Sequence, residues 1–358
     1  MELLSVTMND GVKPRSEIEG KDNSSEDKSN YKIVRKGDMV YNSMRMWQGA
    51  NGISPCDGIV SPAYTVLMPK QEINNGYFAA LFKSVTLINE FRKNSQGMTS
   101  DTWNLKYPQI ETIKVQIPSV CEQDKVSELF SVLDERIVAQ SQLVESLKKY
   151  KRGLLRKVFA KLSDSCEKRN LKEVSVLFAD GDWIESKDQA LDGIRLIQTG
   201  NVGFGVYIDK TQNAKYISET TFHRLNCLEL YDGDILISRL PEPAGRACLL
   251  PKSTERRITA VDCTVIRTDS SVIDRNYLLQ FLCSEQYLKT VNSFLAGGTR
   301  QRISRKNLEG IEVPYPSIDE QRYWGSFLCK VDARISNEEQ RRSSLSRLRC
   351  FMLQQLFI

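Results

Sequence analysis

Residues 113–159 of this chain recur as residues 311–357, at a constant offset of 198 and without a gap. Fourteen of the 47 aligned positions are identical. Unrelated segments would share about three, so self-similarity on this scale indicates a duplicated unit. Upstream the match continues with a drifting offset, as loop insertions produce, in the pairs 36–43 with 232–239 and 59–67 with 258–266. The sequence therefore predicts a globular unit, a long helix, a second globular unit and a second long helix.

Each globular unit is predicted to be mostly strand, because short apolar or alternating runs lie between turn signals. The predicted strands are 38–43, 65–69, 194–198, 234–238 and 263–267. One helix is predicted in each unit from apolar residues at helical spacing, at 77–91 and 277–291. The expected fold class is α+β, with two β-rich domains at 1–119 and 163–317, each followed by a long helix, at 120–162 and 318–358.

Each long helix carries a heptad seam, in which apolar positions alternate steps of three and four residues. The apolar members of the two seams are Leu133, Ile137, Val144, Leu147, Leu154, Val331, Ile335, Leu345 and Met352. Polar residues interrupt the seams at Gln140, Lys151, Glu338, Arg342 and Arg349. Each seam needs a partner, and the nearest candidate is the other copy, so we expect an antiparallel coiled coil with pseudo-twofold symmetry. The alternative is two amphipathic helices that each pack on their own domain.

Composition limits the class of protein. Hydrophobic residues make up 41% and charged residues 27% of the chain, as in soluble globular proteins. We find neither a membrane-spanning run of about 18 apolar residues nor a secretory signal in MELLSVTMNDGVKPR. Nine cysteines without a C-x-x-C pair favour reduced thiols and a cytoplasmic protein. The net charge of +5 permits an anionic partner without requiring one.

Candidate catalytic groups are few. His223 is the sole histidine, which excludes Ser-His-Asp, Cys-His and multi-histidine metal sites, and we expect it to be solvated or satisfied in the core. Glu185 and Lys187 supply half of a nuclease motif, but Asp180 and Asp182 lie too close in the sequence to be its usual distal partner. We therefore predict no catalytic, cofactor-binding or metal-binding residues, and a chain that recognises a partner. A nuclease that uses Glu185 and Lys187 ranks third among the hypotheses.

Motifs that occur in order, and twice, resemble the specificity subunit of type I restriction–modification enzymes. DGDWIESKDQALDGIRLIQTGNVGFG (180–205) is similar to the opening of that family's recognition domain. The second half of the domain is matched by YDGDILISR (231–239) and GGTRQRISRKNLEGIEVPYPSIDEQ (297–321). The first unit has weaker equivalents in RKGDMVYNS (35–43) and QGMTSDTWNLKYPQIETIKVQIPS (96–119). The resemblance covers nearly the whole chain.

The resemblance implies a non-catalytic subunit that recognises a bipartite sequence in double-stranded DNA, with one target-recognition domain for each half. It also implies two modification (methyltransferase) subunits, which dock on the helices and bring S-adenosylmethionine, and a restriction subunit that translocates and cleaves DNA with ATP and Mg²⁺. The helices, each roughly 50–60 Å long, would act as a ruler between the domains. The alternative is a protein-interaction scaffold with two β-rich modules, which would show no salt-dependent binding to duplex DNA.

Basic loop residues are the candidates for DNA contact, because arginine suits both guanine edges and phosphates. In the second unit they are Arg239, Arg246, Arg256, Arg257, Arg300, Arg302, Arg305 and Lys306. In the first unit they are Lys13, Arg15, Arg45 and Trp47. The alternative for each is a solvated charged surface.

The first unit begins almost at the strand that matches 194–198, whereas the second unit has 171–193 before it. We therefore expect the first recognition domain to lack its opening and to be less stable than the second.

Overall fold

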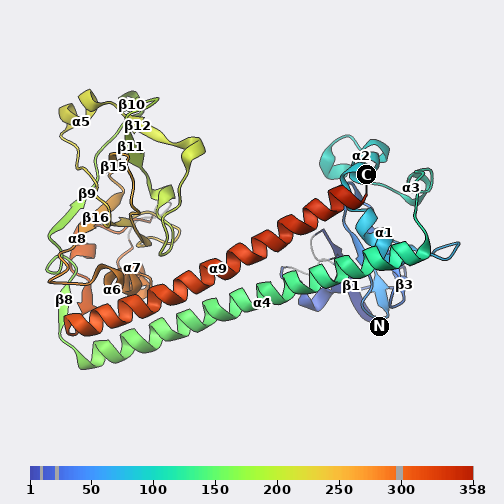
Figure 1. Ribbon diagram of the computed structural model, residues 1–358, viewed down its shortest axis with the longest axis horizontal. Coiled ribbons are helices and arrows are strands. Elements are labelled where there is room, and N and C mark those ends of the chain that lie inside the picture. The colour runs from blue at the N-terminus through green and yellow to red at the C-terminus, as the bar shows by residue number, and fades with distance from the viewer. Residues whose placement is uncertain (9–10, 21–23, 296–300, 358) are drawn as a thin grey trace. The chain divides into compact units, whose positions relative to one another are not determined.

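The computed structural model describes residues 1–8, 11–20, 24–295 and 301–357 (Figure 1). It divides into two compact units. Unit 1 consists of Met1–Gln142 together with Glu338–Ile358, and unit 2 consists of Leu143–Asn337. Unit 1 therefore combines the first part of the chain with its last part.

Unit 1 contains two small sheets. The first has the strand order β2-β1-β6-β3, from β1 (Glu2–Thr7), β2 (Gly11–Pro14), β3 (Lys32–Val34) and β6 (Gly58–Val60). The second has the order β5-β4-β7, from β4 (Met39–Asn42), β5 (Asn51–Ile53) and β7 (Tyr64–Leu67). Strand β1 runs parallel to β6 and antiparallel to β2.

Unit 2 repeats this topology and adds to it. Strand β11 (Ile194–Ile197) pairs parallel with β15 (Arg257–Thr259) and antiparallel with β12 (Lys215–Ile217), which also pairs with β10 (Gln189–Ala190). The second sheet has the order β14-β13-β16-β9, from β9 (Leu177–Asp180), β13 (Ile235–Ser238), β14 (Ala247–Leu249) and β16 (Cys263–Arg267). A two-stranded sheet joins β8 (Lys168–Asn170) to β17 (Glu312–Pro314). The five predicted strands correspond to β4, β7, β11, β13 and β16, so these predictions are confirmed.

The single helix predicted in each unit is wrong in one respect, because the structure has two helices in its place. They are α1 (Asn75–Leu81) and α2 (Val85–Asn94) in unit 1, and α6 (Arg275–Leu282) and α7 (Glu285–Ser293) in unit 2. A buried serine begins the second helix of each pair: Ser84 Oγ accepts the Leu87 N–H at 3.3 Å, and Ser284 Oγ accepts the Tyr287 N–H at 3.2 Å. Such an N-cap favours a new helix start over continuation.

The two long helices are α4 (Val120–Ser165) and α9 (Ile318–Leu356). In unit 1, Gln140 lies against Glu338, and Arg349 lies against Asp134. In unit 2, Lys151 pairs with Asp332. As the residue numbers rise along α4, those of the contacting residues on α9 fall, so the two helices pack antiparallel. The predicted α+β fold with a coiled coil is confirmed.

The apolar seam residues lie on the packed side of the helices: all nine of those predicted are buried or half-buried. The C-terminal ends of both helices also pack into a domain core, which the seam did not predict. Phe159 of α4 lies 5.5 Å from Tyr277 in unit 2, and Phe357, directly after α9, lies 5.4 Å from Tyr77 in unit 1 (ring centroids). The last turns of α9 therefore complete unit 1 in the way that α4 completes unit 2.

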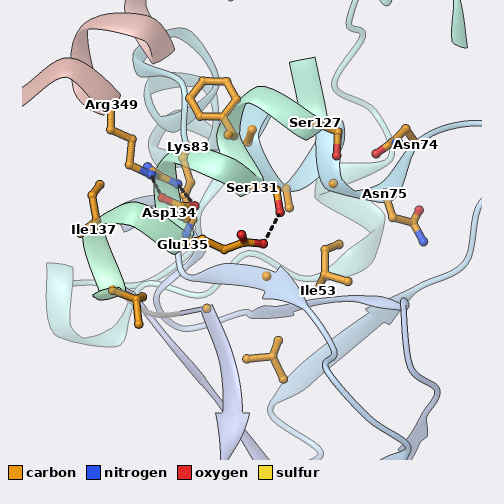
Figure 2. A pocket seen from close by; sticks show the side chains of 18 of the residues that line it. Ile53, Asn74, Asn75, Lys83, Ser127, Ser131, Asp134, Glu135, Ile137 and Arg349 are labelled. Atoms are coloured by element: carbon orange, nitrogen blue, oxygen red, sulfur yellow. Dashed lines mark hydrogen bonds and ion pairs between the residues drawn. The ribbon is translucent and has the colours of Figure 1, made fainter. Parts of the chain in front are cut away.

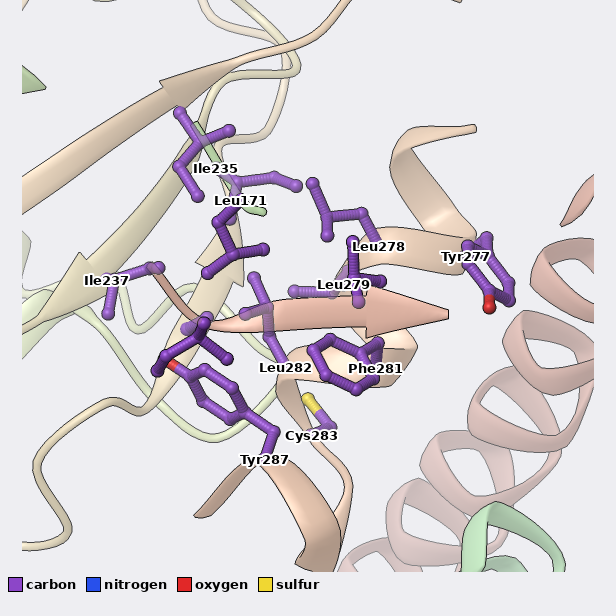
Figure 3. Packing of buried hydrophobic residues seen from close by; sticks show 14 of the residues in the cluster. Leu171, Ile235, Ile237, Tyr277, Leu278, Leu279, Phe281, Leu282, Cys283 and Tyr287 are labelled. Atoms are coloured by element: carbon purple, nitrogen blue, oxygen red, sulfur yellow. The ribbon is translucent and has the colours of Figure 1, made fainter. Parts of the chain in front are cut away.

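The largest core lies in unit 2, where α6 and α7 pack against β13 and the C-terminal end of α4. Figure 3 shows Leu171 inserted between Ile235 and Leu278 of this core. Three further short α-helices are α3 (Tyr107–Ile110), α5 (Glu219–Leu225) and α8 (Arg305–Glu309).

Candidate nucleic-acid interface

Two of the candidate arginines in unit 2 are internal. Arg239 and Arg257 are each 4% exposed. Arg239 lies 3.2 Å from Asp180 and donates to the Val261 carbonyl at 2.6 Å, and burial lowers the pKa of its guanidinium. Arg257 donates to Asp232 at 2.6 Å. These side chains join neighbouring strands and loops, and a duplex would have to displace their partners to reach them.

Arg246 is also committed to the fold. Its guanidinium donates to the backbone carbonyls of Thr199, Val202, Leu240 and Pro243 at 2.7–3.1 Å. Partial burial lowers the pKa of this group. Five N–H donors in a fixed fork can satisfy several carbonyls at once, so Arg246 holds the loop after β13 against the loop after β11.

Arg256 lies at the surface between two carboxylates. It donates to both oxygens of Glu229, at 2.7 and 3.1 Å, and to Glu219 at 2.5 Å. Its guanidinium also lies 4.7 Å from the Phe222 ring centroid. The adjacent arginine is the main reason that the pKa of Glu229 is lowered. Arg256 therefore brings little uncompensated positive charge to the surface.

The basic residues at the start of α8 and just before it are more exposed to solvent than Arg239 and Arg257. Arg302 lies 3.3 Å from Asp262 and Arg305 lies 3.2 Å from Glu309, and the arginine side chains are 42% and 49% exposed. Lys306 is exposed in the first turn of α8. Arg300 lies outside the described residues.

In unit 1 the candidates are dispersed. Arg15 donates to the carbonyls of Ile18 and Gly20, and Arg45 is half-buried beside Trp47. The Trp47 ring lies 5.1 Å from that of Trp103 in an edge-to-face pair, and its indole N–H donates to the Met44 carbonyl. Arg92, which the sequence analysis did not select, lies 5.7 Å from the Trp47 ring.

Lys13 lines a cleft of about 970 Å³ within unit 1, between β2, β5, α1 and α4. Figure 2 shows Asp134 of this cleft held by Arg349, and Glu135 accepting a hydrogen bond from Ser131. The described residues that line the cleft include no histidine or cysteine. Its two carboxylates, Asp134 and Glu135, are engaged by Arg349 and Ser131.

A smaller pocket in unit 2 was missed by the sequence analysis. It measures about 180 Å³ and is lined by Arg195, Lys210 and Lys215 together with the polar residues Gln198, Thr199, Asn201 and Asn213. No carboxylate is among its lining residues. Arg195 is 4% exposed and donates to Asp209 at 2.8 Å, whereas both lysines are exposed. The sequence signal was the pair of lysines that flanks the turn at 211–213.

The residues considered for catalysis have other roles. His223 is exposed on α5, with its ring 3.8 Å from Glu219, as a solvated histidine would be. Lys187 pairs with Glu185 at 2.7 Å. Asp182 accepts the Leu228 N–H at 2.9 Å, and burial raises its pKa. Within the described ranges, no group of three or more His, Cys, Asp or Glu side chains is arranged to hold a metal.

The described helices include none that is long and apolar enough to cross a bilayer. All nine cysteines are unpaired.

Comparison with known proteins agrees with this architecture. The chain is 24% identical to the type I restriction enzyme MjaVIII specificity subunit of Methanocaldococcus jannaschii over 336 residues, which cover 88% of this chain and 77% of that protein. Among solved structures, its fold is similar to a chain from a study of complex assembly and conformational transition of the type I R-M system, with a TM-score of 0.59, 19% identity and coverage of 93% and 84% of the two chains. It is also similar to the type I restriction–modification S subunit of M. genitalium, with a TM-score of 0.56, 18% identity and coverage of 91% and 84%.

The family model described as the type I restriction modification DNA specificity domain matches twice, at residues 5–149 and 163–347. The two matches correspond to the two halves of the internal repeat and cover most of the chain. They do not favour the alternative of a protein-interaction scaffold. The chain therefore belongs to the family of type I restriction–modification DNA specificity subunits, which recognise DNA for the enzyme rather than carry out its chemistry.

Proposed function

We propose that each unit recognises one half of a bipartite DNA target. The observation that carries this proposal is the shared topology: β1, β2 and β6 of unit 1 pair as β11, β12 and β15 do in unit 2. Two similar recognition modules in one chain suit two half-sites, as two-fold related modules do in other DNA-binding proteins.

We propose that exposed basic residues of unit 2 make the phosphate contacts. Lys210 and Lys215 border a pocket without a carboxylate, and Arg302, Arg305 and Lys306 lie on one exposed loop and helix start. Exposed lysines release counterions from DNA without breaking internal pairs, which supplies salt-dependent affinity. Arg239, Arg246 and Arg257 would instead shape the recognition loops. For each of these residues, contact with DNA remains a prediction.

We propose that the chain works with two modification subunits, which supply S-adenosylmethionine, and with a restriction subunit, which uses ATP and Mg²⁺. Exposed apolar residues along α4 support docking of other subunits, since a solvated helix rarely presents several such side chains. They are Leu129 at 42%, Val132 at 51%, Leu143 at 39% and Tyr150 at 57% exposed. The unpaired cysteines support action in the cytoplasm, where thiols stay reduced.

The test has two stages. Methylome sequencing of a host that expresses this chain with its modification subunit should reveal a bipartite motif. Binding of the purified chain to that duplex is then measured against salt for the double variant Lys210→Ala/Lys215→Ala. Its salt slope should fall by about two, since each lost phosphate contact removes about one. Lys289→Ala, an exposed lysine on α7 paired with Glu285, is the control. A methylome without a bipartite motif would contradict the proposed function.

A further inference from the structure

In unit 1, a buried glutamine joins the start of α4 to the recognition domain. Gln123 is 1% exposed. Its amide oxygen accepts the Asn74 N–H at 3.0 Å, and its amide nitrogen donates to the Pro118 carbonyl at 2.9 Å. Asn74 is also the N-cap of α1, where its side chain accepts the Tyr77 N–H at 3.0 Å. The glutamine therefore connects the first turn of α4 to the first turn of α1.

The internal repeat contains the same connection in unit 2. Gln321 is 0% exposed, accepts the Asp274 N–H at 3.0 Å and donates to the Pro316 carbonyl at 2.9 Å. Asp274 is the N-cap of α6, and its side chain accepts the Tyr277 N–H at 2.8 Å. Breaking these bonds would leave buried polar groups unpaired, which is costly. Each glutamine therefore holds its long helix at one position against its own domain.

One turn further along each long helix, the domain helix crosses it at a glycine. In unit 1 the glycine belongs to α1, since a Cβ atom on Gly76 would collide with Ser127 Oγ of α4. In unit 2 the glycine belongs to the long helix instead. A Cβ atom on Gly325 of α9 would lie 2.5 Å from Asp274 Oδ1 and 2.7 Å from the Tyr277 nitrogen. Both crossings are therefore too close for a side chain on both helices.

The two crossings are reciprocal. Gly76 occupies the repeat position of Asn276, and Ser127 occupies that of Gly325. One partner of each crossing is thus a glycine, and the other carries a short polar side chain. The glycine lies on a different helix in each copy, yet both copies keep the close approach. The approach itself is therefore the shared feature, rather than the residue at either position.

Further contacts in unit 2 follow one face of α9. Four residues spaced four, three and four apart lie on this face: Gln321, Gly325, Leu328 and Asp332. Leu328 is buried in the same core as α6, and Asp332 Oδ2 accepts the Gln280 amide at 2.8 Å. In unit 1, Phe130 occupies the position of Leu328 and is buried in one core with Tyr77. Contacts over successive turns fix the direction of each long helix as well as its starting point.

The direction of a long helix affects everything further along it. A change of angle of about 10° at the start of a helix moves a point about 30 Å along that helix by roughly 5 Å. This displacement exceeds the base-pair step of about 3.4 Å. A small change of angle at either connection would therefore alter the distance between half-sites by at least one base pair.

We propose that Gln123 and Gln321, together with the two glycine crossings, are positioning residues. They hold each recognition domain at one angle on its own helix, so that a single spacer length is accepted. The inference rests on the proposed recognition of a bipartite target. None of these residues is among the basic side chains assigned to DNA contact, so loss of a connection should change the spacer and leave both half-site sequences as they were.

The test uses unit 1 and methylome sequencing of a host that expresses the full chain with its modification subunit. Gln123→Leu removes both side-chain hydrogen bonds, and Gly76→Asn places a side chain in the crossing. For each variant, the ratio of methylation at the wild-type spacer to methylation at spacers one base pair longer or shorter should fall about tenfold. Gln142→Leu, at an exposed glutamine of the same helix, is the control and should keep the wild-type ratio.

A double variant gives unit 1 the arrangement of unit 2. Ser127→Gly added to Gly76→Asn removes the side chain that the asparagine meets, so the wild-type ratio should return. A general loss of stability would instead lower methylation at every spacer alike and leave the ratio unchanged.

An unchanged ratio in either single variant would overturn the inference, as would an effect of Gly76→Asn that Ser127→Gly does not relieve. If Gly76→Asn does not fold, Gln123→Leu decides. A bipartite motif that is absent already with the unaltered chain would contradict the proposed function instead, so the two failures are distinguishable.

Discussion

Gln140 donates its side-chain amide to Glu338 Oε2 at 2.8 Å and to the Glu338 carbonyl at 3.0 Å, and these two residues occupy the same position of the internal repeat. Equivalent positions of the two repeat copies are therefore in contact at this pair. On either side, Lys151 pairs with Asp332, and the repeat equivalents Arg349 and Asp134 pair in the same way. The same ion pair between α4 and α9 therefore occurs twice, once in each unit.

The Gln140–Glu338 pair should fix the register of α4 against α9, at some cost in stability. Glu338 is 1% exposed, so Glu338→Leu should lower the free energy of unfolding by about 1–3 kcal/mol, because the Gln140 amide loses its side-chain acceptor. The double variant with Gln140→Leu should recover most of that loss. Urea unfolding followed by helical circular dichroism measures both. Glu338→Gln, which keeps a carbonyl acceptor, is the control, and a stable Glu338→Leu single variant would contradict the assignment.

The twin ion pairs should act locally. Arg349→Met should loosen α4 around Asp134 in unit 1, and Lys151→Met should loosen α9 around Asp332 in unit 2. Each change should cost about 1 kcal/mol or less, because both carboxylates are partly solvated. Peptide-level hydrogen exchange distinguishes the two responses. If either variant altered both units equally, the contacts would not be local.

Replacing a buried basic residue of unit 2 should lower stability, whereas replacing an exposed one should weaken DNA binding. Arg257→Ala removes a paired internal guanidinium and should lower stability by about 1–3 kcal/mol. Lys306→Ala should change stability by less than about 0.5 kcal/mol but reduce the salt slope of DNA binding by about one. Thermal unfolding and salt-dependent anisotropy, measured on both variants, check this. A destabilised Lys306→Ala would assign that lysine to the fold.

The helices should determine the length of the recognised spacer. Seven residues added to α4 after Gln142, with seven added to α9 before Glu338, lengthen the pair by roughly 10 Å. The spacer between half-sites should then grow by about three base pairs at 3.4 Å each, while both half-site sequences stay the same. Methylome sequencing of a host with the variant reports the spacer directly. An unchanged spacer would mean that these helices do not define the distance.

Unit 1 should open more readily than unit 2. Its β7 edge is half-buried and Val115 is 37% exposed, so less apolar area stabilises it, at about 25 cal/mol for each Å². Hydrogen exchange should be faster in residues 1–110 than in 171–317. Equal protection in the two ranges would show that the open edge costs unit 1 little.

The sequence by itself determined what depends on local pattern and on repetition. The offset of 198, the five strands and the heptad seam specify two similar α+β units and two helices that pair, because periodicity along the chain decides which faces are apolar. The motifs in that order were sufficient to indicate the family.

Tertiary structure decided what depends on partners distant in sequence. Phe357 completes unit 1 because Tyr77 lies beside it, and no local pattern records that contact. Arg239, Arg246 and Arg257 appear in the sequence as a basic patch, yet each is held by partners that other loops supply. The helix predicted at 77–91 is divided at Ser84, because the buried Ser84 hydroxyl caps the helix that follows. Side-chain environment is a property of the folded chain, and residue type alone does not contain it.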